Sequence, residues 1–176
     1  MPILYIAVMA VAFLLDRVVK NWAAGPLVDV HGGVLPLIPG VFQFTYAENR
    51  GAAFSILQGR TWLLIVLTAV SCLVATCGGT GYVQSPSSFY NTAFSLLPPV
   101  IAIALALGGA LGNLYDRVVL GYVIDMFDFC LINFAVFNVA DSFVNIGVVM
   151  LAIWMVFFEE KDKRRGDFRW GRPLPQ

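Results

Sequence analysis

One run of sequence limits the possible folds more than any other feature. Across 55 consecutive residues, Thr61–Tyr115, there is no Asp, Glu, Lys, Arg or His. A helix that crosses a bilayer needs about 20 apolar residues, so this run can hold two such helices and a turn between them. The Gly-, Ser- and Pro-rich segment Gly78–Asn91 is typical of that turn. We therefore predict membrane spans at 61–77 and 94–115, and we assign no function to the uncharged loop.

The composition of the whole chain extends this prediction to an integral membrane protein. Of its 176 residues, 59% are hydrophobic and 12% are charged, whereas soluble domains have about 45–50% apolar and about 25% charged residues. A chain this small could not bury so much apolar surface in one core. Two further apolar segments lie at 3–24 and 138–158. The predicted fold class is all-α: a single membrane domain with a bundle of four transmembrane helices, followed by a basic tail at 159–176.

The distribution of charge predicts how the chain is oriented. Four spans place both termini on one side, and six of the 11 Lys and Arg residues follow Phe158. Positive charge concentrates on the cytoplasmic side, so we predict cytoplasmic termini and two outer segments, Gly25–Arg60 and Asp116–Phe137. In the first of these, aromatic residues alternate with Gln and Thr across Val41–Tyr46. That alternation predicts a strand in a small sheet on the outer membrane surface.

Several classes of site find no support in the residues. Cys72, Cys77 and Cys130 form no CxxC pair, and the single histidine, His31, lies in a predicted loop. Neither a disulfide framework nor a zinc site is indicated, and a Ser-His-Asp arrangement is not apparent. No basic stripe carries interleaved aromatic residues, which argues against nucleic acid as a partner. We predict no metal and no cofactor.

Three aspartates stand among apolar neighbours near the predicted ends of spans. Asp141 falls about one turn into the last span, where an ionisable group is costly and usually functional; the alternative is a charge that favours a helix N-terminus. Asp125 and Asp128 follow the third span at its outer rim and would share one face if their segment were helical. The alternative for both is a loop charge at the level of the headgroups, and we favour this alternative for Asp128.

The first span carries three charges. Asp16 and Lys20 are four residues apart on one helix face and predict an ion pair, whereas Arg17 points elsewhere and is expected to extend outward. These charges also argue against a cleaved leader ending near Ala23-Ala24-Gly25. We therefore expect the first span to be retained.

The third span ends in a polar, glycine-rich segment. Three glycines allow another helix to approach closely: Gly108, Gly109 and Gly112. Asn113 and Arg117 share one helix face, and Asp116-Arg117 ends the span. Arg117 is expected to pair with a carboxylate or to hold a peptide carbonyl.

Paired aspartates at a membrane rim allow one type of catalysis. Two carboxylates that lie close together cannot both ionise, so they share a proton and one pKa rises. The ionised aspartate can take a proton from water while the neutral one donates to a carbonyl oxygen, which hydrolyses an amide without a covalent intermediate. From spacing alone, any two of four aspartates could form the pair: Asp116, Asp125, Asp128 and Asp141.

The chain resembles the lipoprotein signal peptidases, also called signal peptidase II, in four strings that follow one another in order. They are D-R-V-V-K at Asp16–Lys20, N-R-G-A-A-F-S at Asn49–Ser55, G-G-A-L-G-N-L-Y-D-R-V at Gly108–Val118 with V-I-D-M at Val123–Met126, and F-N-V-A-D-S at Phe137–Ser142. The family consists of bacterial intramembrane aspartyl proteases. They cut the signal peptide from a prolipoprotein just before a cysteine that carries diacylglycerol, and the resemblance implies the same activity here.

The resemblance also implies residue roles. It makes Asp125 and Asp141 the catalytic dyad. Other positions match residues that line or support the site, namely Asn49, Gly51, Gly109, Asn113, Arg117, Asn138 and Ala140, or that have a structural role, namely Asp16, Lys20 and Asp116. The implied partners are lipid-modified prolipoproteins and membrane lipid. The chain is expected to act as a monomer in the bacterial inner membrane, with its active site at the outer leaflet.

Two other functions remain open from the residues alone. A small transporter or proton-coupled binding protein could use Asp16, Lys20 and Asp141 as a proton relay, although four spans without a repeat fit transporters poorly. A structural membrane subunit would carry out no chemistry, and Asp→Asn changes in it would have no effect on activity.

Overall fold

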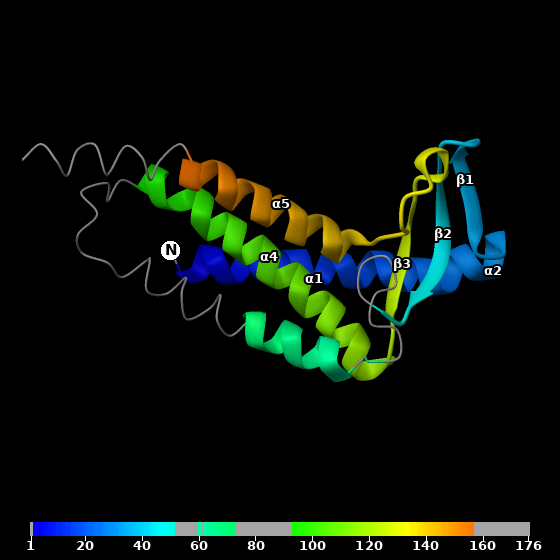
Figure 1. Cartoon of the computed structure of the whole chain (residues 1–176), viewed down its shortest axis with the longest axis horizontal. Helices are drawn as coiled ribbons and strands as arrows, with labels where there is room; N and C mark the ends of the chain where they lie inside the picture. Colours follow the sequence, from blue (N-terminus) through cyan, green and yellow to red (C-terminus); the bar gives the residue numbers. More distant parts are fainter. Residues whose placement is uncertain (1, 52–59, 61, 73–92, 157–176) are drawn as a thin grey trace, which may run out of the picture.

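The structure is a computed structural model that describes residues 2–51, 60, 62–72 and 93–156. Most of these residues are helical. Helix α1 (Pro2–Trp22), helix α4 (Ala93–Val119) and helix α5 (Val139–Trp154) pack against one another, and a small sheet lies at one end of them (Figure 1). A further helix covers Trp62–Cys72. The elements that carry the predicted site residues therefore meet where the helices reach the sheet.

Among the residues that the structure describes, two helical segments are long and apolar enough to cross a membrane, Pro2–His31 and Leu97–Val119. The helices Trp62–Cys72 and Val139–Trp154 are also apolar but are shorter within the described residues. The prediction of a mostly helical chain with a small sheet is confirmed, whereas the number of four spans stays a prediction. The loop at Gly78–Asn91 and the tail at 159–176 lie outside the described residues.

The first helical segment ends later than the sequence predicted. Helix α1 continues into a π-helical turn, Ala23–Leu27, and then into helix α2, Val28–His31, so the segment ends at His31 instead of Ala24. Pro26 has no backbone N–H to donate, and it lies within the π-helical turn without ending the helix. The segment stops at Gly32, whose φ of 63° lies in the left-handed region and whose N–H donates to the Val28 carbonyl at 3.0 Å.

The sheet has three antiparallel strands in the order β1, β2, β3. They are β1 (Val34–Ile38), β2 (Phe42–Asn49) and β3 (Val123–Asp128). Strand β2 confirms the strand predicted at Val41–Tyr46 and extends it to Asn49. Strands β1 and β2 form a hairpin, whereas β3 joins them from a distant part of the chain.

The segment around Asp125 is strand β3, so the helix on which Asp125 and Asp128 would have shared a face is not formed. The register of β3 places Ala47 opposite Asp125 and Asn49 opposite Val123. The neighbouring run of apolar residues is a strand because its buried side chains, Ile124 and Met126, pack beneath the sheet. Pairing of β2 with β3 thereby brings Asn49 to Asp125 across a sequence separation of 76 residues.

A small apolar core joins the sheet to the end of α1. Its buried members are Ala23, Leu27, Ile124 and Met126. The ring of Trp22 packs edge-on against Phe44, with the ring centroids 5.1 Å apart. This packing holds β3, and with it Asp125, in a fixed position relative to the helices.

Glycines on α4 allow the helices to approach closely, as predicted. A Cβ added at Gly108 would lie 2.6 Å from the carbonyl oxygen of Met9, and one at Gly112 would lie 2.5 Å from Oδ2 of Asp16. A Cβ at Gly109 would overlap the carbonyl oxygen of Ala140. Helix α4 therefore contacts α1 with one side and the first turn of α5 with another.

We expect the substitution Gly147→Ala in α5 to destabilise the helix packing. The added methyl group would overlap the carbonyl oxygen of Ala102 and lie 3.0 Å from the Cβ of Ala106, and such overpacking costs about 1–3 kcal/mol. The free energy of unfolding can be measured by titration with SDS in mixed micelles. Gly25→Ala is the control, since a Cβ at Gly25 has nothing within 4 Å. An equal loss in both variants would contradict the close packing of α4 and α5.

Candidate active site

Four charged side chains form a buried cluster between α1 and α4. Lys20 Nζ lies 2.8 Å from Asp116 Oδ2 and 3.1 Å from Asp16 Oδ2. Arg17 pairs with the same two carboxylates, at 2.7 Å from Asp16 Oδ2 and through its Nη1 with Asp116 Oδ1. Two cations thus balance two carboxylates. A neutral and fully paired cluster is the arrangement in which buried charges can be retained.

The cluster confirms one prediction and corrects another. Asp16 and Lys20 form the predicted ion pair. Arg17, however, does not extend outward: its side chain is 15% exposed and turns towards Asp116. Charge balance explains the direction of Arg17, because Lys20 alone would leave the two buried carboxylates with a net negative charge. Helix α4 also continues to Val119 instead of ending at Tyr115.

The same cluster holds the backbone on two sides of the site. Asp116 Oδ2 accepts a hydrogen bond from the Ile124 N–H at 3.3 Å, and Asp16 Oδ1 accepts one from the Ala140 N–H at 3.0 Å. Each of these amides belongs to the residue just before one of the predicted catalytic aspartates. The ion cluster therefore fixes strand β3 and the start of α5 relative to each other.

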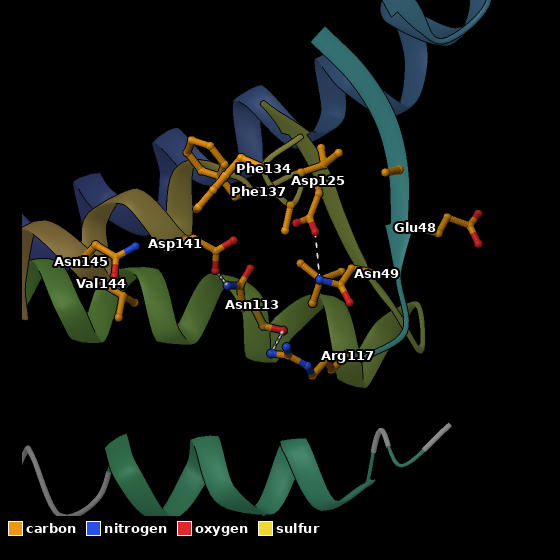
Figure 2. Close-up of a pocket in the computed structure, with 14 residues that line it drawn as sticks. Glu48, Asn49, Asn113, Arg117, Asp125, Phe134, Phe137, Asp141, Val144 and Asn145 are labelled. Atoms are coloured by element: carbon orange, nitrogen blue, oxygen red, sulfur yellow. Dashed lines mark hydrogen bonds between the residues drawn. The ribbon is translucent and has the colours of Figure 1, made fainter. Parts of the chain in front are cut away.

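Asp125 is held by amide groups on both of its carboxylate oxygens. It is 2% exposed. Its Oδ1 accepts from Asn138 Nδ2 at 2.6 Å. Its Oδ2 accepts from Asn49 Nδ2 at 3.0 Å (Figure 2). Asn49 is itself oriented by a turn, since its Oδ1 accepts from the Gly51 N–H at 2.9 Å. These hydrogen bonds therefore fix the orientation of the Asp125 carboxylate.

Asp141 lies in the first turn of α5 and closes a capping box with Asn138. Asn138 Oδ1 accepts from the Asp141 N–H at 2.9 Å, and Asp141 Oδ2 accepts from the Asn138 N–H at 3.2 Å. The other oxygen of Asp141 accepts from Asn113 Nδ2 at 2.7 Å (Figure 2). The alternative considered from the sequence, a charge at a helix N-terminus, describes this location correctly. Asp141 also lines the same cavity as Asp125.

Two asparagines connect the aspartates with the ion cluster. Asn138 Nδ2 donates to Asp125 Oδ1 and also to Asn113 Oδ1, the latter at 3.2 Å. Asn113 Oδ1 accepts a second hydrogen bond from Lys20 Nζ at 2.7 Å, while its Nδ2 donates to Asp141. The positions of Asp125 and Asp141 thus depend on a continuous hydrogen-bond network that begins in α1.

A cavity of about 610 Å³ lies between β2, α4 and α5 and contains both aspartates. Figure 2 shows the labelled side chains around it. Its polar lining consists of Glu48, Asn49, Asn113, Arg117, Asp125, Asp141 and Asn145, and apolar side chains of Val123, Phe134, Val136, Phe137 and Val144 form much of the rest. Carboxylates and an apolar surface therefore face the same space.

Arg117 holds a peptide carbonyl, which was one of the two outcomes predicted for it. Its Nη2 donates to the Gly51 carbonyl at 3.4 Å and its Nη1 to the Asn113 carbonyl at 3.5 Å. Gly109 packs against the backbone of Ala140, and neither residue lines the cavity within the described part of the chain. Their small size allows the approach of α4 to the start of α5.

Asp128 is directed to other partners than Asp125. It accepts hydrogen bonds from Gln43 Nε2 at 2.8 Å and from Thr45 Oγ1 at 2.9 Å. The shared helical face considered for Asp125 and Asp128 does not exist, because the segment is a strand. Asp29 and Glu48 are exposed.

Sequence reasoning missed several of the residues that form the site. Asn145 lines the cavity and lies four residues after Asp141, so the helical spacing could have revealed it. Phe134 and Phe137 carry no comparable signal, because a loop has no fixed periodicity. Among the described residues, no group of three or more His, Cys, Asp or Glu side chains could hold a metal ion.

The surroundings of Asp125 make it a weaker acid than usual. Burial has the largest effect on its pKa, and the negative charge of Asp141 adds to it; together they raise the pKa from 3.8 to about 7. The amide donors of Asn138 and Asn49 and the charge of Lys20 oppose the rise. A carboxyl that is partly protonated near neutral pH can serve as an acid or as a base.

Comparison with known sequences identifies a single family. A family model described as signal peptidase (SPase) II matches residues 8–157. A lipoprotein signal peptidase of Clostridioides difficile (strain 630) is 43% identical over 160 residues, which cover 91% of this chain and 99% of that protein. Another, from Trichormus variabilis, is 41% identical over 150 residues, with coverage of 81% and 83%.

Solved structures show the same fold. One is described as a bacterial membrane enzyme determined by the in meso method at 2.3 Å resolution; it has a TM-score of 0.73 and 28% identity, and the match covers 96% of this chain and 94% of that one. A second bacterial membrane enzyme, determined at 1.9 Å, has a TM-score of 0.69 and 29% identity, with coverage of 88% and 93%.

We expect Lys20→Met to destabilise the protein strongly. The substitution keeps most of the side-chain volume but leaves two buried carboxylates with one cation, and breaking a buried ion network in this way costs about 3–5 kcal/mol. The matched control is Arg50→Met, because Arg50 pairs with Glu48 at the surface, where their side chains are 63% and 37% exposed. That pair is worth about 0–1 kcal/mol. The free energy of unfolding in mixed micelles measures both effects, and a Lys20→Met variant as stable as Arg50→Met would contradict the role of charge balance.

The raised pKa of Asp125 predicts a pH dependence of stability. The folded protein keeps the Asp125 proton up to about pH 7, whereas the unfolded chain loses it near pH 4. The folded state therefore binds more protons in this interval, so this contribution to stability decreases as the pH rises from about 4 to about 7.

The measurement is the free energy of unfolding of wild type and of Asp125→Asn as a function of pH. The difference between the two should decline across that interval and be constant above it. Asp29→Asn, at an exposed position, serves as the control and should follow the wild-type curve. A constant difference between wild type and Asp125→Asn from pH 4 to pH 8 would show that the pKa of Asp125 is not raised.

Proposed function

The chain belongs to the signal peptidase II family, and we propose that it uses Asp125 and Asp141 as a catalytic dyad to cut diacylglyceryl-modified prolipoproteins just before the lipidated cysteine. Membership makes the chain a lipoprotein signal peptidase, a membrane protease that removes signal peptides from prolipoproteins. The chain is therefore a protease. It is neither a transporter nor a structural subunit without chemistry.

One observation carries the choice of Asp125 and Asp141: of the four aspartates left open by spacing, these two line a common cavity. Asn138 also bridges them, since its side chain hydrogen-bonds to the Asp125 carboxylate and to the Asp141 backbone. Asp116 is occupied by Arg17 and Lys20, and Asp128 by Gln43 and Thr45. Neither of these two lines the cavity within the described residues.

The proposed reaction is hydrolysis of a peptide bond by water. One aspartate is ionised and accepts a proton from the attacking water, while the other is neutral and donates a proton to the carbonyl oxygen. The tetrahedral diol then collapses, the bond to nitrogen breaks, and the nitrogen leaves as an amine after receiving a proton. A shared proton between two close carboxylates supplies both states at once, and the raised pKa of Asp125 supports such sharing near neutral pH.

Neighbouring polar residues support the dyad in this proposal. Asn49, Asn113 and Asn138 orient the carboxylates through the hydrogen bonds described above. Arg117 lines the cavity and donates to the Gly51 carbonyl. A set of fixed amide donors holds the carboxylates in position without pairing either of them with a cation.

The apolar part of the cavity suits a lipidated substrate. Phe134, Phe137 and Val144 lie close to the carboxylates, so an acyl-bearing cysteine could enter while its peptide bond meets the dyad. The residues that line the cavity come from β2, β3, α4 and α5 and from the segment before α5. These elements meet where the helices reach the sheet (Figure 1), and in this proposal that end lies at the outer leaflet of the bacterial inner membrane. The proposal also includes four spans and cytoplasmic termini. It includes a monomer, because one chain supplies both aspartates.

The dyad predicts that Asp125→Asn and Asp141→Asn each lower the cleavage rate by at least about a thousandfold, since each removes a general acid or base. The assay is cleavage of a diacylglyceryl-modified prolipoprotein by purified protein in detergent. Asp128→Asn is the matched control and should cleave at nearly the wild-type rate, because Asp128 bonds to Gln43 and Thr45.

Two further controls make the outcome specific. Circular dichroism should show the same helix content in all variants, which separates lost chemistry from lost folding. The same prolipoprotein without diacylglycerol should resist wild-type cleavage. A cleaving Asp125→Asn or Asp141→Asn variant would refute the dyad, and efficient cleavage of the unlipidated substrate would refute the proposed role of the lipid.

A further inference from the structure

Asn145 lies in the cavity of the candidate active site, outside the hydrogen-bond network that holds the two aspartates. It is exposed and lines the same cavity as Asp141. Figure 2 shows it further along α5 from Asp141, away from the sheet. Four residues are a little more than one turn, so the two side chains share one helix face and lie about 6 Å apart along the axis. Both are therefore accessible to one ligand in the cavity.

The amide of Asn145 differs from the two other asparagine amides that line this cavity. Asn49 donates to Asp125, Asn113 donates to Asp141, and the side-chain oxygens of both asparagines accept further hydrogen bonds. The Asn145 amide makes no hydrogen bond to any residue that the structure describes. One donor group and one acceptor oxygen therefore remain available for a ligand.

An available amide is costly at this position. Between Phe143 and Trp154, Asn145 is the only residue with an amide or a charged side chain, and α5 belongs to the last of the proposed spans. Polar groups inside a membrane usually serve a function, because the hydrocarbon gives them no partners. A polar ligand that enters the cavity would offset the cost of the Asn145 amide.

The substrate peptide brings suitable groups into the cavity. The backbone of a helix bonds to itself and encloses its peptide bonds, so the segment around the scissile bond must be extended when it meets the dyad. Extension leaves backbone groups without partners in a medium that lacks water. An asparagine amide can pair with the N–H and the C=O of one extended residue, since it has both a donor and an acceptor. An ester carbonyl of the substrate lipid only accepts, and it would leave the Asn145 oxygen unpaired.

The spacing of Asp141 and Asn145 selects one residue of the peptide. An extended chain advances about 3.3 Å per residue, and its backbone groups point to the same edge at every second residue. Two residues thus span about 7 Å, close to the roughly 6 Å between the two side chains along α5. Helix α5 runs away from the sheet (Figure 1), and a signal peptide upstream of its cleavage site runs into the membrane in the same direction. A scissile carbonyl at the dyad therefore places the residue two positions earlier at Asn145.

We propose that Asn145 is a substrate-binding residue whose amide hydrogen-bonds to the backbone N–H and C=O of the third residue before the lipidated cysteine. This inference rests on the proposed function and adds a contact to it. The contact fixes the register of the extended peptide, so that the dyad meets the bond before the cysteine.

The test is a double-mutant cycle between the enzyme and the substrate backbone. The substrate is a synthetic diacylglyceryl lipopeptide in detergent, made either with all amides or with an ester that replaces the N–H of the third residue before the cysteine by oxygen. Wild type should cleave this ester analogue with a kcat/KM about tenfold lower, as expected for the loss of one enclosed hydrogen bond. Asn145→Leu keeps most of the side-chain volume. It should cleave the all-amide lipopeptide about tenfold less efficiently than wild type and show no further loss with the ester.

Three controls make this outcome specific. An ester at the second residue before the cysteine, whose N–H points to the opposite edge, should change kcat/KM by the same factor in wild type and in Asn145→Leu. Asn21→Leu removes an exposed amide from α1 outside the cavity lining, and it should behave as wild type with every substrate. Circular dichroism should show the same helix content in all variants.

The outcomes separate this inference from the proposed dyad. Cleavage of the all-amide lipopeptide by wild type and its loss in Asp125→Asn support the dyad. With that result in hand, an equal effect of the third-residue ester on wild type and on Asn145→Leu would overturn the role of Asn145. A diether lipid on the substrate that slows wild type but not Asn145→Leu would also overturn it, because Asn145 would then bind the lipid carbonyl. Failure of wild type to cleave the all-amide lipopeptide would overturn both proposals.

Discussion

Two carboxylates and two cations lie buried between α1 and α4, and they can remain there because their charges sum to zero. Each of Asp16 and Asp116 pairs with both Arg17 and Lys20, so no charge lacks a partner of opposite sign. The carboxylates also accept backbone hydrogen bonds from Ile124 and Ala140. The interaction that makes buried charge tolerable in a membrane protein therefore also sets the distance between strand β3 and the start of α5.

The environment of the two proposed catalytic aspartates differs from that of the cluster. Asp125 and Asp141 accept hydrogen bonds from uncharged amides, and Asn113 connects Lys20 with Asp141 in the hydrogen-bond network. A cation in direct contact would hold a carboxylate in its ionised form. Amide donors fix orientation with a weaker effect on protonation, and burial together with the neighbouring charge can then raise the pKa of Asp125 to about 7. Asparagine spacers thus separate the structural charges from the carboxyls that must exchange protons.

Features that depend on nearby residues could be predicted from the sequence. The Asp16–Lys20 pair follows from helical spacing, the strand at Val41–Tyr46 from alternation, and the contacts of α4 from its glycines. Arg17 could not be predicted in this way, because its direction is set by Asp116, 99 residues away. Strand β3 could not be predicted either, because its residues form a strand by pairing with β2 and by packing in the buried core.

The choice of Asp125 and Asp141 among four aspartates came from resemblance, and the physical reason for it is tertiary. Whether an aspartate is free to react depends on which partners occupy it, and the partners of Asp116 and Asp128 lie on other elements.

Asn138 shows why the local and the functional explanations of Asp141 are not alternatives. Its side chain caps α5 through the Asp141 N–H, and it also donates to the Asp125 carboxylate. If α5 began one residue earlier or later, the residue closing the capping box would change, and the side chain at position 141 would rotate by about 100° around the helix axis. The hydrogen bonds that determine where the helix begins therefore also direct Asp141 towards the cavity. A carboxylate at this position gains from the helix N-terminus, which offsets part of the cost of burying it beside a second carboxyl.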